Sequence, residues 1–286
     1  MGSIYTVANQ KGGVGKTTSV VNLAAYLAQM GKKTLVIDVD PQGNATSGLG
    51  IEKVQTGHDR STQRYSTYDV LINNIPIKEA IYPSGIEMLD ILPSSLDLAG
   101  AELELAEKDG KESVLRQKVK DIKDGYDFIL LDAPPSLGLL TINALVAAEW
   151  AIIPIQCEYY ALEGVSQLMK TFQLIQKRLN PELEIGLIIM TMYDSRVRLG
   201  QQVIEEVRKA FGQKVSRTLI PRNIRLSEAP SHGDPISIYD PKSSGARAYH
   251  DIAEEIIHHG EKGSGEGSGS VNRRQSIRGW FKRSGA

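Results

Sequence analysis

The sequence lacks the features on which several classes of protein depend. It contains one cysteine, Cys157, in 286 residues, which excludes a disulfide framework and an iron–sulfur cluster built from its own cysteines. No apolar run approaches the roughly 18–20 residues that span a bilayer, and no signal peptide precedes the first predicted strand. Hydrophobic residues still make up 41% of the chain. We therefore expect a soluble, globular protein in a reducing cytoplasm.

The chain also has almost no net charge, −1 at neutral pH, but the charge is unevenly placed. Residues 261–286 carry six basic and two acidic side chains, a charge of +4, which leaves −5 for residues 1–260. An acidic body is not typical of a general DNA-binding protein. If this chain binds DNA, we expect it to do so through a local basic patch.

Strand-like and helix-like segments alternate along the chain, which predicts an α/β fold with a mostly parallel, twisted sheet and helices on both faces. The predicted strands are 3–8, 34–39, 86–92, 127–132, 151–155, 185–192 and 215–220. The predicted helices are 17–30, 96–107, 111–123, 138–148, 160–179, 200–211 and 244–259. The helix over 17–30 is expected to end at Gly31, because glycine is common just after a helix. A polar surface loop is predicted at 53–66.

Three regions follow from this pattern. Residues 1–260 are predicted to form one domain, and residues 261–270 a Gly/Ser-rich linker. Residues 271–286 form a basic tail, in which Ile277, Trp280 and Phe281 have helical i, i+3, i+4 spacing. This spacing would suit an amphipathic membrane anchor, but Gly279 weakens a helix, and a disordered tail that assists DNA binding is an equal alternative. A segment appended to the natural chain is a third.

The first predicted strand leads into Lys11-Gly12-Gly13-Val14-Gly15-Lys16-Thr17-Thr18 and then into a helix. The ordinary phosphate-binding loop has the pattern G-x-x-x-x-G-K-[ST], and here Gln10 replaces its first glycine. Backbone N–H groups and the helix N-terminus can surround phosphate oxygens. Lys16 can reach the terminal phosphates, and the Thr17 hydroxyl can bind Mg²⁺. The loop predicts a nucleotide site with a second lysine, Lys11, that needs its own explanation.

Carboxylates follow two other predicted strands. Asp38 and Asp40 stand at i, i+2 after the second strand, so their side chains are expected to point the same way. Such a carboxylate can orient the attacking water or hold a metal-bound water, although Asp40-Pro41 is also ordinary turn chemistry. Asp132 ends the apolar strand Phe128–Leu131, an arrangement that places a carboxylate near Mg²⁺.

These three motifs, in this order, resemble the ParA/Soj class of DNA-partitioning ATPases, within the MinD/ParA group that has the deviant Walker A loop. The resemblance extends over residues 1–260 and includes segments 35–50, 132–138, 154–164 and 220–231. It implies the fold of a P-loop nucleoside triphosphatase, with ATP and Mg²⁺ as cofactors. It does not cover the 53–66 loop or the tail.

The resemblance also implies roles for individual residues. Lys11 is the signature lysine, which reaches across a nucleotide-sandwich homodimer to the partner's phosphates. Lys16 acts on the bound phosphates, and Asp40 is the carboxylate for the hydrolytic water. Thr17 and Asp132 hold the metal. The adenine lies against Pro221 and Asn223, and the loop residues that bind the nucleotide are Lys11, Gly12, Gly13, Val14, Gly15, Lys16, Thr17 and Thr18.

Partners are implied in the same way. Proteins of this class bind DNA without sequence preference, and Arg196 and Arg225 match the positions implicated in that contact. A ParB-like protein bound to a centromere would stimulate hydrolysis, so we expect a nucleoid-associated ATPase that drives chromosome or plasmid partitioning. The alternative is a MinD-like positioning ATPase that cycles on a membrane through its tail. Metabolic enzymes with related loops are disfavoured, because no second substrate motif is found.

Overall fold

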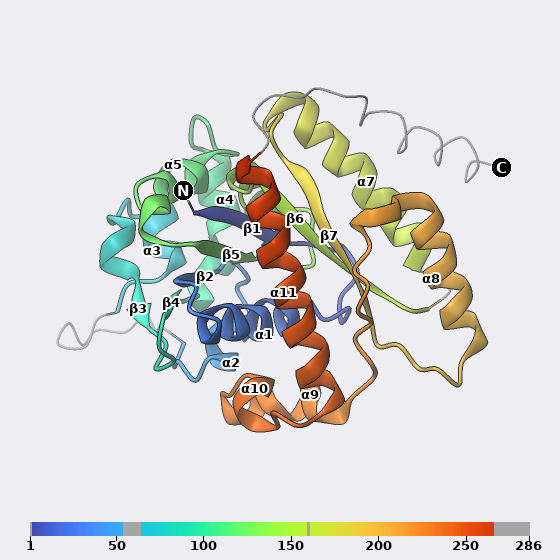
Figure 1. Ribbon diagram of the computed structural model, residues 1–286. Coiled ribbons are helices and arrows are strands. Elements are labelled where there is room, and N and C mark those ends of the chain that lie inside the picture. Colours follow the sequence, from blue (N-terminus) through green and yellow to red (C-terminus); the bar gives the residue numbers. More distant parts are fainter. Residues whose placement is uncertain (1, 54–63, 159–160, 266–286) are drawn as a thin grey trace.

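A computed structural model describes residues 2–53, 64–158 and 161–265 and contains one seven-stranded sheet (Figure 1). Its strands are β1 (Ser3–Val7), β2 (Thr34–Asp38), β3 (Tyr82–Pro83), β4 (Leu89–Leu92), β5 (Phe128–Asp132), β6 (Trp150–Gln156) and β7 (Glu184–Thr191). The spatial order is β3-β4-β2-β5-β1-β6-β7, and only the β3–β4 pair is antiparallel. The predicted mostly parallel α/β fold is therefore confirmed.

Helices connect the strands. They are α1 (Lys16–Gln29), α2 (Asn44–Gly48), α3 (Thr67–Leu71), α4 (Ala101–Ala106), α5 (Val114–Lys120), α6 (Leu139–Ala147), α7 (Ala161–Arg178), α8 (Arg198–Phe211), α9 (Ile224–Glu228), α10 (Ile236–Tyr239) and α11 (Ser244–Gly265). Short 3₁₀ turns lie at Ile77–Ala80, Leu96–Ala99, Lys123–Gly125, Gly212–Lys214 and Ala229–His232. Within the described ranges, none of the helices has the length and apolar character of a membrane span.

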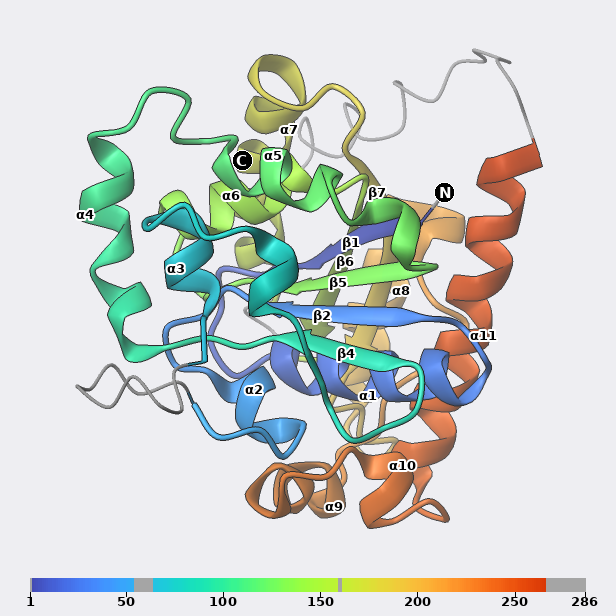
Figure 2. The same ribbon diagram turned by 90° about the vertical axis from the view of Figure 1, so that its left-hand side faces the viewer.

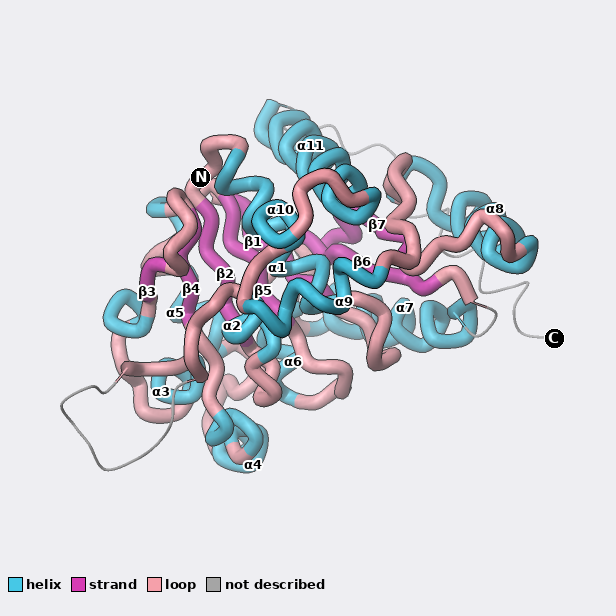
Figure 3. Tube along the Cα trace, turned by 90° about the horizontal axis from the view of Figure 1, so that it is seen from below, coloured by secondary structure: helices cyan, strands magenta, loops and turns pink. Residues whose placement is uncertain are grey.

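The sheet separates two hydrophobic cores because successive strand residues point to opposite faces. In β5, Ile129 and Leu131 belong to the core beneath α3 to α8, whereas Phe128 and Leu130 belong to the core beneath α1, α2 and α9 to α11. Figures 2 and 3 show α1, α2, α9 and α10 together on one side of the sheet. Both faces are covered, as the continuous apolar strands predicted.

Helix α1 positions the phosphate loop and shows how the sequence fixes its end. Gly31 has a φ of 75°, and its N–H donates to the Ala28 carbonyl at 2.9 Å. Lys32 N–H donates to the Leu27 carbonyl at 3.0 Å, which completes a Schellman motif. The predicted stop at Gly31 is thus correct, and its reason is the left-handed backbone that glycine adopts without strain.

Two predicted elements differ from the structure. Residues 215–220 do not form a regular strand: Val215 makes an isolated bridge to Ile188, and Ser216 N and Ile220 N donate to carbonyls of β7 at 2.8 and 2.9 Å. The N–H groups of Arg217 and Thr218 are instead bound by the Glu255 carboxylate of α11, each at 3.2 Å. The predicted helix over 96–107 is interrupted at Gly100, where a 3₁₀ turn gives way to α4.

The predicted loop, linker and tail lie largely outside the residues that the structure describes. Most of the 53–66 loop and the whole tail, with Ile277, Trp280 and Phe281, lie outside the described residues. Helix α11 runs to Gly265, into the range predicted as linker. The division at residue 260 stays a prediction.

Candidate functional site

The predicted motifs meet at the carboxyl ends of the central strands. In the sheet register Asp132 pairs with Val7 of β1 on one side and with Asp38 of β2 on the other. The loop that follows β1 therefore begins directly beside both carboxylates. From β1 the chain first continues to strands on one side of it, β2 to β5, and later to β6 and β7 on its other side. In open α/β sheets, ligands bind outside the carboxyl ends of the strands where the strand order changes direction in this way.

The glycine loop turns into α1 through two left-handed residues. Gly13 has a φ of 73° and Gly15 a φ of 89°, conformations that side chains with a Cβ rarely adopt. The Thr191 hydroxyl at the end of β7 donates to the Val14 carbonyl at 2.9 Å and fixes the loop from the far side. These glycines turn the loop at the N-terminus of α1, where the helix dipole favours an anion.

Lys16 begins α1 and is 7% exposed. Burial lowers the pKa of its ammonium group, while the neighbouring carboxylates of Asp132 and Asp40 act in the opposite direction. A buried cation among carboxylates at the mouth of a glycine loop can attract a phosphate and hold it against the helix.

Asp132 is the least satisfied group in this region. Its side chain is fully buried, and neither carboxylate oxygen has a hydrogen-bond partner among the described residues. Burial raises the pKa of Asp132 well above its ordinary value, and the nearby Asp38 carboxylate raises it further. The Thr17 hydroxyl is close enough to oppose this shift, although it makes no hydrogen bond of normal geometry with either oxygen. A divalent cation between Thr17 and Asp132 would satisfy both oxygens, so the residues present fit Mg²⁺.

Asp40 occupies a tight turn between β2 and α2. It is 6% exposed, and its Oδ1 accepts a hydrogen bond from Gln42 N at 2.9 Å. Among the described residues, only Oδ1 of this carboxylate accepts a hydrogen bond. The turn interpretation and the catalytic interpretation are therefore compatible, because one oxygen caps the turn and the other is left for a ligand or water.

Lys11 is not directed at the phosphate cradle of its own chain in this structure. Its Nζ donates to Gln156 Oε1 at 3.1 Å and lies 3.2 Å from Glu158 Oε2, just after β6. Gln156 Nε2 also donates to Glu158 Oε1 at 2.6 Å. The sequence did not predict these partners, although two polar residues directly after an apolar strand were a visible signal. The Lys11 side chain is 35% exposed and can exchange this pair for another.

Pro221 and Asn223 line a cavity of about 480 Å³ that adjoins the glycine loop. Gly15 and Thr18 form its loop side, and Leu226 of α9 its apolar wall. Asn223 also caps α9, since its side-chain oxygen accepts from Arg225 N at 2.9 Å. The structure thus brings Pro221 and Asn223 to one cavity with residues of the loop and of α1.

Arg196 and Arg225 are both exposed and both paired with carboxylates. Arg196 binds Asp194 through Nε at 2.9 Å and Nη2 at 2.7 Å, and these bonds lower the pKa of Asp194 to about 2. Arg225 lies 2.9 Å from Glu228 and 3.5 Å from Asp240. Either arginine would have to exchange its carboxylate for a phosphate in order to bind DNA.

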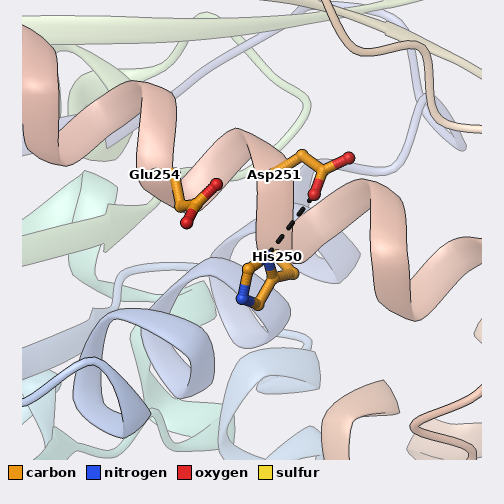
Figure 4. Close-up of side chains that lie close together, drawn as sticks. All are labelled: His250, Asp251 and Glu254. Carbon is orange, nitrogen blue, oxygen red and sulfur yellow. Dashed lines mark hydrogen bonds and ion pairs between the residues drawn. The ribbon is translucent and has the colours of Figure 1, made fainter.

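A separate polar group lies on α11. His250, Asp251 and Glu254 place possible ligand atoms within 4.8 Å of one another, and all three side chains are exposed. In Figure 4 only His250 and Asp251 are joined, at 3.4 Å. None of the three lines the cavity beside the glycine loop, so we do not include them in the site.

Comparisons with known proteins agree with this geometry. A family model described as an AAA domain matches residues 2–185. The sporulation initiation inhibitor protein Soj of Bacillus subtilis (strain 168) is 53% identical over 260 residues, which cover 91% of this chain and 100% of that protein. The chromosome-partitioning ATPase Soj of Treponema pallidum (strain Nichols) is 49% identical and covers 90% of this chain and 98% of its own length.

Solved structures are similar as well. Cobyrinic acid a,c-diamide synthase from Mycobacterium smegmatis, with bound ADP and magnesium, superposes with a TM-score of 0.77 at 33% identity. The match covers 95% of this chain and 100% of that one. The name of that protein is a metabolic one, so the fold is shared with a protein named for a different activity.

Proposed function

This chain belongs to the family of Soj and ParA chromosome-partitioning ATPases, and on that premise we propose that it dimerises on ATP and binds DNA without sequence preference. A ParB-like partner then stimulates hydrolysis and returns the chain to the monomer. The observation that carries the nucleotide and metal part of the proposal is the buried carboxylate of Asp132 beside Lys16 and Thr17, which has no hydrogen-bond partner among the described residues. Such a group costs stability, and a bound nucleotide–metal complex would remove that cost.

Within the nucleotide site, the backbone N–H groups of residues 12–17 and the ammonium group of Lys16 hold the phosphates. Thr17 and Asp132 hold Mg²⁺, which, when bound, neutralises charge on the terminal phosphates. The base occupies the cavity beside Pro221 and Asn223. Asp40 orients the hydrolytic water through the carboxylate oxygen that the turn does not use.

Lys11 acts on the phosphates of a second copy of the chain. Support for this role comes from its position at the surface, where a weak pair with Glu158 restrains it rather than the phosphate cradle of its own chain. A cation supplied by the partner neutralises charge on the transferring phosphoryl group, as an arginine finger does. ATP is then part of the dimer interface.

DNA binding would use Arg196 and Arg225 of both protomers. Each contact replaces a carboxylate with a phosphate and releases counterions, so retention on DNA should fall steeply with salt. Because a dimer presents twice as many contacts, the nucleotide state controls DNA affinity through valence.

The proposal is tested by measuring retention on non-specific DNA and flotation with anionic liposomes side by side. The full chain and a chain ending at Gly265 are each examined with ATP and Mg²⁺, with ADP and without nucleotide. We expect both chains to be retained on DNA, in a salt-sensitive way, only in the condition that contains ATP and Mg²⁺. Neither chain should float with the liposomes. Absence of DNA retention, with flotation that depends on residues 271–283, would replace this proposal with the MinD-like alternative.

Asp194 gives a matched test of the DNA surface. Asp194→Asn removes the charge that holds Arg196, so ATP-dependent DNA retention should increase by about 3- to 10-fold at moderate salt, the scale of one phosphate contact. Arg196→Ala and Arg225→Ala should each weaken retention, whereas Arg208→Ala on α8 serves as an exposed control. Equal retention by all four variants would remove the DNA role of these arginines.

A further inference from the structure

Asp40 belongs to a closed ring of hydrogen bonds that the sequence did not predict. Asp38 Oδ2 accepts from Thr46 N at 2.8 Å and from Thr46 Oγ1 at 2.7 Å. Thr46 Oγ1 accepts from Ser94 N at 3.0 Å, and Ser94 Oγ donates to the Asp40 carbonyl at 2.7 Å. Asp40 N donates to Asp38 Oδ1 at 3.2 Å and closes the ring.

The ring is sealed from solvent. Asp38, Thr46 and Ser94 are 0% exposed, and Asp40 is 6% exposed. Water cannot easily reach such a position, so a bond that a substitution removes from the ring is not replaced by one to solvent. The bonds therefore restrict the geometry of the turn more strongly than the same bonds at a surface would.

The ring joins three segments, and the one that contains Ser94 is distant in sequence from the other two. Asp38 ends β2, Thr46 lies in α2, and Ser94 follows β4. Both the N–H and the carbonyl of Asp40 are bound within the ring, so the peptide groups on the two sides of its Cα are fixed. The direction of the Asp40 carboxylate is set by that backbone and by the bond from Gln42 N.

We propose that Ser94 and Thr46 are positioning residues for the carboxylate of Asp40, acting through this ring of hydrogen bonds. The inference rests on the proposed role of Asp40 in orienting the hydrolytic water. A displacement of about 1 Å in such a group can reduce the rate by on the order of 100-fold. Ser94, 54 residues from Asp40, supplies the bond that holds the Asp40 carbonyl to the end of β4.

Ser95 is a matched control for Ser94. It is 1% exposed, but its hydroxyl is bound by Ser66 Oγ at 3.1 Å, away from the turn. Ser94→Ala is expected to fold, because the Asp40 carbonyl keeps a second bond, from Gly43 N at 2.9 Å. Thr46→Val keeps the shape of the side chain without its hydroxyl, and Thr46→Ser restores the hydroxyl.

The experiment measures single-turnover ATP hydrolysis, ATP affinity and melting temperature of the full chain with Mg²⁺. Ser94→Ala and Thr46→Val should reduce the rate at saturating ATP by about 10- to 100-fold. ATP affinity should stay about the same, and Thr46→Ser should recover most of the rate. Ser95→Ala should leave the rate unchanged. If Ser95→Ala slows hydrolysis as much as Ser94→Ala, the effect is general loss of packing and the inference is overturned.

A second background separates this inference from the proposed function. When Asp40 is replaced by alanine, Ser94→Ala should cause no further loss, because residues that act through one group are not additive. A further tenfold loss there would overturn the positioning role. If Asp40→Ala alone leaves hydrolysis intact, the proposed role of Asp40 fails and this inference fails with it. If Asp40→Ala abolishes hydrolysis but Ser94→Ala does not slow it, only this inference is wrong.

Discussion

Two carboxylates at neighbouring strand ends have opposite environments, although they pair in the sheet register. Asp38 accepts hydrogen bonds from Thr46 and from Asp40 N, whereas Asp132 accepts none among the described residues. The difference follows from the turn after β2, which brings donors to Asp38, while Ala133 and Pro134 after β5 bring none to Asp132. The unsatisfied carboxylate is the one we assign to Mg²⁺.

Replacing Asp132 by asparagine should stabilise the chain without ligands and remove its metal-dependent activity. Asparagine has about the same shape but cannot ionise, so it avoids the cost of burying a charge, and the free energy of unfolding should rise by about 2 kcal/mol at neutral pH. Nucleotide hydrolysis with Mg²⁺ should fall by at least about 100-fold. Urea unfolding and ATP turnover of the same preparation check both effects.

The stability gained by Asp132→Asn should depend on pH. The folded-state pKa of Asp132 is raised, so the wild-type chain loses stability as the pH rises from the unfolded-state value of about 4. The gain from Asp132→Asn should therefore be small at pH 4 and larger at pH 7. Asp121→Asn, at an exposed carboxylate, is the control and should change stability by less than about 0.5 kcal/mol. A destabilised Asp132→Asn chain at pH 7 would contradict the assignment.

At single residues, short motifs identify positions that the structure brings together, whereas their roles stay predictions. The glycine loop, Lys16 and the carboxylate positions follow from short motifs, and the structure places them together. The partners of Lys11 were not predicted, because Gln156 and Glu158 reach it only when β6 lies next to β1. The ring through Ser94 was missed for the same reason, since its bonds cross from β4 to the turn after β2.

At the scale of elements, helix α9 lines the cavity beside the glycine loop, and the N-terminus of α11 packs against Leu226 of α9. A Cβ on Gly245 would lie 2.8 Å from Leu226 Cγ and 2.9 Å from its Cδ1. Leu226 in turn lines the cavity beside Pro221 and Asn223. The missing side chain at Gly245 therefore gives Leu226 its position.

Gly245→Ala should displace Leu226 and weaken both packing and nucleotide binding. We expect a loss of about 1–3 kcal/mol in the free energy of unfolding from overpacking, and weaker binding of a fluorescent ATP analogue. Gly164→Ala in α7 is the matched control, since no atom would lie within 4 Å of its new Cβ. It should raise stability by about 0.5–1 kcal/mol through helix propensity. Equal thermal denaturation midpoints for the two variants would contradict this account of the wall.

Long elements were predicted more reliably than short ones. Helices α1, α7 and α8 and the buried strands carry enough apolar residues to show their period, and Gly31 marks the end of α1. Helices α2, α3, α9 and α10 have five residues or fewer, too few for a period to appear. The segment 215–220 has a strand-like pattern, but Glu255 of α11 binds two of its N–H groups, those of Arg217 and Thr218, and nothing within the segment indicates that.

At the scale of the whole molecule, the groups with a proposed catalytic role lie at the carboxyl ends of central strands and differ in how they are held. Asp40 is fixed by buried bonds, whereas Lys11 is held by a surface pair with Glu158. An exposed pair of this kind contributes about 0–1 kcal/mol, so Lys11 can leave it readily. Asp40 can therefore act within its own chain, whereas Lys11 is free to contact a nucleotide bound to a second chain.

The fold of the whole molecule could be predicted because alternating apolar segments specify a parallel sheet. The assembly could not be predicted by the same reasoning, because in our proposal the contact that joins two chains forms only when ATP is bound. The resemblance to partitioning ATPases supplied that expectation, and the position of Lys11 at the surface supports it.

The most direct test of the account is the mass of the nucleotide-bound chain. Asp40→Ala slows hydrolysis in this account, so sedimentation velocity of that variant with ATP and Mg²⁺ should show a dimer, and with ADP a monomer. The double variant Lys11→Ala, Asp40→Ala should bind ATP but remain a monomer at the same concentration. A dimer of equal stability in the double variant would contradict the proposal that Lys11 joins the two chains through ATP.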